Sequence, residues 1–168
     1  MIKVYLRNIL RFFVVILLQI LLFDNIELSG YINPYFYVIF IILLPFESPK
    51  EILLTIAFLL GLTMDLLYIT PGIHTSATVF MAFLRPFILQ SFAPRDGYEP
   101  GTFPRIYYYG LAWFAKYTFL LVFAHHFLLF FVEVFSIRDL PDILLRTIFS
   151  GILTTVLILI SQYFIYRK

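Results

Sequence analysis

Apolar runs follow one another along almost the whole chain and are separated by short polar segments. Six runs can be marked, at residues 4–23, 28–46, 52–69, 73–92, 111–135 and 143–165. Most have the roughly 20 residues that an α-helix needs to cross the hydrocarbon core of a bilayer, and they lack the alternation typical of a half-buried strand. The pattern therefore predicts an all-α integral membrane protein with about six transmembrane helices, forming one polytopic domain over residues 1–168.

The composition supports this prediction. Hydrophobic residues make up 62% of the chain and charged residues only 13%, which is too apolar for one soluble core of this length. Lys3 and Arg7 precede the first apolar run as in a signal peptide, but no small-residue cleavage site follows, so we expect this run to remain as the first span. The chain has no cysteine, which excludes disulfides and thiolate ligands.

The placement of positive charge predicts the topology, because Lys and Arg are enriched in short cytoplasmic loops. With six spans and both termini cytoplasmic, the outer side would hold only Arg138 and Arg146, and Lys116 would lie within the fifth span. The cytoplasmic set would be Lys3, Arg7, Arg11, Lys50, Arg85, Arg95, Arg105, Arg167 and Lys168. This asymmetry favours counting the second run as a span, although Asn33, Pro34 and Pro45 interrupt it.

Polar residues stand out in the third and fourth runs. Ala57, Gly61 and Asp65 lie four residues apart, hence on one helix face, where small side chains allow close helix packing. A second stripe follows in the fourth run, at Thr75, Thr78, Ala82 and Arg85. Pro71 and Gly72 predict a tight turn between the two helices, with Thr75 or Ser76 capping the second one.

A hairpin turning at residue 71 or 72 would set Asp65 level with Thr78 and Gly61 level with Ala82. Arg85 would then lie about 10 Å from the level of Asp65, so a direct pair would be stretched. A buried charge costs at least about 2.5–3.5 kcal/mol in a membrane helix. Two interpretations of Asp65 remain open: Thr78, His74 or water satisfies it within the fold, or it belongs to a polar site for a partner or ligand.

Other polar groups suggest weaker hypotheses. Asp65, His74 and Ser76 contain the residue types of a hydrolase triad, but no nucleophile elbow accompanies them. His125 and His126 suggest either metal binding or helix packing, and adjacent helical residues diverge by about 100°. Gly151 and Thr155 predict another packing face in the sixth run. No phosphate-binding or dinucleotide motif and no nucleic-acid footprint is present, and no metal or other cofactor is indicated.

The segment GLTMDLLYITPGIHTSATVFMAFLRPF, residues 61–87, resembles the rod shape-determining protein MreD family of bacteria. The residues that carry the resemblance are Gly61, Asp65, Pro71, Gly72, His74 and Arg85. The resemblance implies a fold similar to the small substrate-binding subunits of energy-coupling-factor transporters. It implies no enzymatic activity, and it implies a location in the bacterial cytoplasmic (inner) membrane.

The resemblance also implies partners. Family members bind the scaffold MreC and through it join MreB, RodA and a penicillin-binding transpeptidase, which together direct peptidoglycan synthesis and maintain cell shape. The interaction elements would be the third and fourth spans around Gly61, Asp65 and Arg85, together with the outer helix ends. The alternatives are a vitamin-type substrate-binding subunit and a bare membrane anchor. The bulky first run and the short outer loops speak against the vitamin-type subunit.

Overall fold

The computed structural model describes residues 2–25, 31–99 and 101–165. Helices account for most of this part of the chain, and it contains no β-strand, which confirms the predicted all-helical class. The elements in chain order are α1 (Ile2–Leu18), the π-helical turn η1 (Gln19–Phe23), the 3₁₀ turn η2 (Phe36–Val38), α2 (Ile39–Ile42), α3 (Lys50–Tyr68), α4 (Ile73–Ser91), α5 (Ile106–Val134) and α6 (Leu140–Ile165).

The long helices follow the apolar runs closely. Within the described residues three stretches are long and apolar enough to cross a membrane, namely Lys50–Tyr68, Ile106–Val134 and Leu140–Phe164, so the chain has the character of a helical membrane protein. The left-handed backbone of Ile69 (φ 56°) ends α3. Gly110 (φ 79°) breaks α5 into a first turn and a long helix, because only glycine adopts this conformation without strain. The long part begins at residue 111, where the sequence predicts the fifth span.

The second apolar run is not the continuous helix that the sequence predicts for residues 28–46. Residues 26–30 lie outside the described residues, residues 31–35 are non-helical, and only residues 36–42 form short helical turns. Pro34 cannot donate a backbone hydrogen bond, which explains why no helix forms around it. An extended segment advances about 3.3 Å per residue against 1.5 Å in a helix, so the broken segment can cross the bundle with fewer residues.

The described part of this run, residues 31–46, is the broken segment; it is buried or half-buried, and side chains replace its missing helical hydrogen bonds. The backbone N–H of Tyr37 donates to Gln19 Oε1 (3.2 Å), and Gln19 Nε2 donates to the carbonyl of Pro34 (3.0 Å). The backbone N–H of Tyr35 donates to Thr154 Oγ1 (3.2 Å). Irregular backbone at membrane depth is tolerated only when it is satisfied and buried in this way. The π-helical turn η1 and helix α6 therefore hold the segment in place through these hydrogen bonds.

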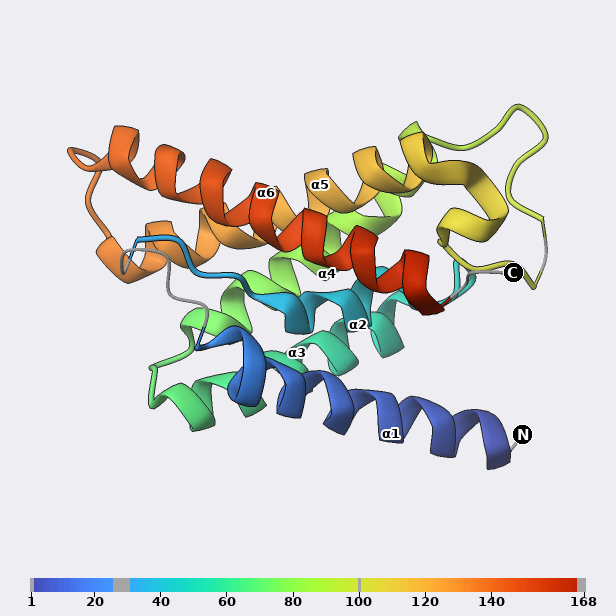
Figure 1. Cartoon of the computed structure of the whole chain (residues 1–168), viewed down its shortest axis with the longest axis horizontal. Helices are drawn as coiled ribbons and strands as arrows, with labels where there is room; N and C mark the ends of the chain where they lie inside the picture. Colours follow the sequence, from blue (N-terminus) through green and yellow to red (C-terminus); the bar gives the residue numbers. More distant parts are fainter. Residues whose placement is uncertain (1, 26–30, 100, 166–168) are drawn as a thin grey trace.

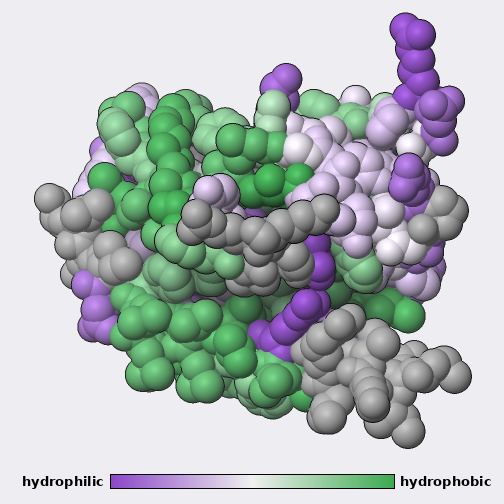
Figure 2. Space-filling view, turned by 45° about the vertical axis from the view of Figure 1, so that its right-hand side comes forward, coloured by the Kyte–Doolittle hydropathy of each residue, from purple (hydrophilic) through white to green (hydrophobic). Residues whose placement is uncertain are grey.

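Figure 1 shows how the elements alternate in direction along the bundle. Both chain ends and the connection between α4 and α5 lie at one end, which we call the termini end, and the turns after α3 and α5 lie at the opposite end. The start of α3 and the connection that carries Arg95 thus share the termini end, and the turn after α5, which carries Arg138, lies opposite. In Figure 2 hydrophilic side chains gather on the right, where the termini end comes forward, and apolar ones cover most of the left.

The connection between α4 and α5 packs back onto the bundle. The ring of Tyr98 stacks on Phe46 at 4.1 Å, and its hydroxyl donates to the carbonyl of Leu89 (2.7 Å). Burial raises the pKa of Tyr98 to about 12, which favours the protonated hydroxyl that donates this hydrogen bond. Trp113 Nε1 donates to the carbonyl of Phe92 (3.0 Å) from the start of α5. The segment is therefore an ordered, aromatic-anchored loop.

Candidate functional site

Asp65 caps the first turn of α4 from the last turns of α3. Its carboxylate accepts the backbone N–H groups of His74 (2.9 Å) and Thr75 (2.8 Å). It also accepts the hydroxyl groups of Thr70 (2.6 Å) and Thr75 (2.5 Å). A helix N-terminus leaves its first N–H groups unpaired and carries partial positive charge, so a carboxylate is the natural group there. Asp65 is 4% exposed, and its hydrogen bonds all come from the hairpin itself.

These contacts show that the fold itself satisfies Asp65, and of the predicted partners His74 binds the carboxylate, through its backbone N–H. Thr78 does not bind the carboxylate; its hydroxyl donates to the carbonyl of His74 (2.7 Å). The expected cap from Thr75 or Ser76 is also wrong, because the cap is Asp65. Ser76 donates to the carbonyl of Ile73 (2.9 Å), so it does not form the hydrogen bond to His74 that a triad requires.

The predicted register of the hairpin is wrong as well. A Cβ added at Gly61 would lie 2.5 Å from the Cα of Thr75 and 2.8 Å from the carbonyl oxygen of His74. Gly61 therefore lies against Thr75, seven residues before the predicted Ala82. The sharp reversal at Ile69 and the cap by Asp65 draw the start of α4 down beside α3. The small-residue stripe still allows close packing, since Ala57 and Ala82 are fully buried.

Arg85 does not pair with Asp65. Its Nε donates to the hydroxyl of Tyr117 (2.9 Å), and its Nη2 donates to the carbonyls of Leu44 and, at 3.3 Å, Pro45. The hydroxyl of Tyr117 in turn donates to the carbonyl of Ile42 (3.0 Å). These carbonyls lie at the end of α2 and in the turn that follows it, and the carbonyl of Pro45 also accepts the backbone N–H and the hydroxyl of Ser48. Arg85 thus caps the broken second segment at its end.

A buried cluster of aromatic and imidazole rings lies between the broken segment and α3, α4 and α5. The hydroxyl of Tyr37 is 3.1 Å from His74 Nδ1 and 2.8 Å from His125 Nε2. Tyr68 stacks on His74 with ring centroids 4.8 Å apart and donates to Asp24 Oδ1 (2.5 Å). The sequence analysis missed Tyr37 as a partner of both histidines. The one sequence feature that pointed to this role of Tyr37 is the interruption at Asn33 and Pro34, because a regular helix is not expected there.

The second histidine of the pair in α5 faces another helix. His126 Nε2 is 3.1 Å from Thr154 Oγ1 in α6, and its Nδ1 is 2.9 Å from the carbonyl of Val122. Glu133 forms an ion pair with Arg146 (3.0 Å) instead of approaching the histidines. Within the described residues no group of three or more His, Asp or Glu side chains is arranged to hold a metal ion. The geometry favours helix packing by His126 over the metal interpretation.

The packing face predicted in α6 is present in the structure. Gly151 and Thr155 are buried, and a Cβ added at Gly151 would lie 3.8 Å from Val122 Cγ1, which is an ordinary contact. Helices α5 and α6 therefore do not approach each other as closely at Gly151 as α3 and α4 do at Gly61. Pro71 and Gly72 form the turn before α4, as predicted, with Gly72 in the left-handed region (φ 87°).

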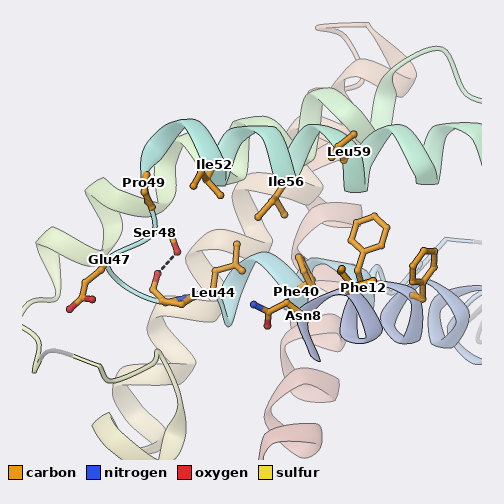
Figure 3. A pocket seen from close by; sticks show the side chains of 13 residues that line it. Asn8, Phe12, Phe40, Leu44, Glu47, Ser48, Pro49, Ile52, Ile56 and Leu59 are labelled. Carbon is orange, nitrogen blue, oxygen red and sulfur yellow. Dashed lines mark hydrogen bonds between the residues drawn. The ribbon is translucent and has the colours of Figure 1, made fainter. Parts of the chain in front are cut away.

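Figure 3 shows an apolar groove between α1 and α3, which we call the α1–α3 groove. It has a volume of about 690 Å³, and its lining includes Glu47, Ser48 and Pro49, which directly precede the start of α3. Ile52 and Ile56 of α3 point into it opposite Phe12 of α1. The other lining residues are Asn8, Ile9, Phe13, Phe40, Leu44, Pro45, Glu47, Ser48, Pro49 and Leu59. Apart from Asn8, Glu47 and Ser48 the lining is apolar, so the groove suits an apolar occupant.

Comparisons with protein-family models, with curated proteins and with solved structures found no match to this chain. The function has to be argued from the arrangement itself. Asp65 and Arg85 are both bound within the fold, and Tyr37 fills the space between His74 and His125. The α1–α3 groove, by contrast, is open at the surface of the protein and is lined mostly by apolar side chains, so it suits an apolar occupant.

Proposed function

We propose that this protein is a non-enzymatic component of the bacterial cell-wall elongation (rod) complex, which binds MreC in the inner membrane. The α1–α3 groove is the observation that carries the proposal. It is large, apolar and flanked by side chains such as Ile52, which is 53% exposed. Helices associate in membranes mainly through close packing, and an open groove offers a partner helix more contact than a convex surface.

The motif that resembles the MreD family supports the proposal indirectly. Asp65 and Gly61 join α4 to α3, and Arg85 fixes the end of the broken segment beside Leu44 and Pro45. Leu44 and Pro45 also line the α1–α3 groove. The motif residues therefore set the shape of a groove that they do not themselves line. Their role in partner binding is one of positioning.

Affinity purification from solubilised bacterial membranes tests the proposal. We expect MreC to co-purify with the wild type and at least tenfold less with Ile52→Trp, because the indole fills the groove. Leu111→Trp is the matched control, since Leu111 is 59% exposed but lines neither wall. Recovery of an energy-coupling transporter module in place of MreC would contradict the proposal and support the vitamin-type subunit.

A further inference from the structure

A second cavity lies on the other side of α1, between α1, α2 and α6, and we call it the α1–α6 cavity. Its volume of about 340 Å³ falls within the roughly 300–1,000 Å³ of small-molecule sites. It is separate from the α1–α3 groove, although Asn8, Phe40, Leu44 and Pro45 contribute to both walls. Nothing in the proposed partner binding uses this cavity.

The lining of the cavity changes from polar to apolar along its length. Arg11, Ser161 and Gln162 line the part near the termini end, together with Phe103 of the α4–α5 connection. Deeper in the bundle the walls are apolar, formed by Val14, Val15, Leu18, Phe36, Ile39 and Phe40. Because α1 and the broken segment run in opposite directions, Leu18 and Phe36 lie at the deep end, and Arg11 and Leu43 lie at the polar end. A single molecule filling this space must be amphipathic.

Two polar side chains at this end lack partners. Arg11 forms no hydrogen bond or ion pair with any residue that the structure describes. Gln162 is 1% exposed, and neither its Nε2 nor its Oε1 has a hydrogen-bond partner there. A buried amide without partners costs about 1–3 kcal/mol, so a ligand that supplies them would be favoured. Arg11 leans toward the N-terminus of its helix and so toward the membrane surface, where lipid phosphates lie.

We propose that the α1–α6 cavity binds one anionic phospholipid of the cytoplasmic leaflet. Arg11 pairs with its phosphate, Gln162 hydrogen-bonds to its headgroup or ester oxygens, and an acyl chain lies along Val14, Leu18 and Ile39. Arginine suits phosphate because its planar fork of donors matches the phosphate oxygens. The anionic lipid also matches the positive charge predicted for this membrane surface.

Native mass spectrometry of the purified protein tests this inference without MreC, so its outcome is independent of the proposed function. The probes are phosphatidylglycerol, phosphatidylcholine with the same acyl chains, and glycerol phosphate without chains. We expect the tightest site to prefer phosphatidylglycerol to phosphatidylcholine at least fivefold and to bind glycerol phosphate far more weakly. Equal binding of the two lipids would overturn the charge-based site, and glycerol phosphate binding as tight as the lipid would overturn the lipid assignment.

Variants locate the site. Arg11→Gln should weaken phosphatidylglycerol binding about fivefold, the effect of one cation near a lipid surface, whereas Arg95→Gln on the exposed loop should not. Val14→Trp should fill the cavity and displace the lipid, whereas Leu17→Trp, which lines neither cavity, should retain it. Gln162→Leu should leave the fold at least as stable, because it removes an unpaired amide, and yet weaken lipid binding. Unchanged binding in Arg11→Gln and Val14→Trp would place the lipid elsewhere.

Discussion

At the scale of single residues, the charged groups of the membrane hairpin have identifiable structural roles. Asp65 faces only donors, two from the backbone of α4 and two from threonine hydroxyls. Arg85 faces only acceptors, two carbonyls and the oxygen of Tyr117. Asp65 binds N–H groups that the start of α4 leaves unpaired, and Arg85 binds carbonyls of the turn after α2, which explains how both charges can lie within a membrane protein without pairing to each other.

The first prediction follows from the donors around Asp65. Asp65→Asn keeps the shape but turns an NH₂ group toward donors, so we expect the free energy of unfolding to fall by about 1–3 kcal/mol. Chemical unfolding in detergent micelles measures this, with Glu99→Gln on the exposed loop as the control. Equal stability of Asp65→Asn and the wild type would show that the carboxylate is not needed as a cap.

A second prediction compares two glycines. Gly61→Ala forces its new methyl group against the backbone of Thr75, so we expect a loss of about 1–3 kcal/mol from overpacking. Gly151→Ala meets only an ordinary contact with Val122 and should be neutral or stabilising, because alanine favours the helix. Thermal unfolding of both variants measures the difference. Similar effects at the two positions would contradict the close approach of α3 and α4 at Gly61.

At the scale of elements, the sequence predicts the long helices correctly but does not predict the broken structure of the second apolar run. Residues 52–69 and 73–92 correspond to α3 and α4 almost residue for residue, because long apolar runs with turn residues between them have few alternatives. A run such as 28–46 is apolar whether it forms a helix facing lipid or a broken segment buried in protein. Only the distant partners Gln19, Thr154 and Arg85 distinguish the two, and one sequence does not show them.

The third prediction concerns this broken segment. Arg85→Leu removes the donors from the carbonyls of Leu44 and Pro45, so we expect α2 and the following turn to open more often. Hydrogen–deuterium exchange in nanodiscs should show about tenfold faster exchange in residues 36–46, equivalent to about 1.4 kcal/mol, with α6 unchanged. Arg95→Gln is the charge control. Faster exchange spread evenly over the chain would point to global destabilisation and contradict a local role.

At the scale of the whole molecule, the bundle has two distinct ends, the termini end and the end with the turns after α3 and α5. The predicted orientation is testable because the chain has no cysteine of its own. Asp96→Cys lies on the α4–α5 connection at the termini end, and Arg138→Cys lies on the turn after α5 at the other. We expect a membrane-impermeant maleimide to label only Arg138→Cys in spheroplasts and both variants after lysis. The reverse labelling would invert the topology.

The candidate site was also only partly predictable from the sequence. Asp65 was expected to face protein, and it is buried. Their partners come from elements whose position depends on the whole bundle, as with Tyr37 between His74 and His125. The α1–α3 groove was not predictable, because it depends on how far α1 lies from α3.

The most direct test of the account is site-specific photo-crosslinking in living cells. A photoreactive amino acid at Ile52, inside the α1–α3 groove, should crosslink to MreC, and the same group at Leu111 should not. Mass spectrometry identifies the product, and equal insertion of both variants is checked first. A product with MreC at Ile52 alone would agree with the account; no MreC product at Ile52, or equal products at both positions, would contradict it.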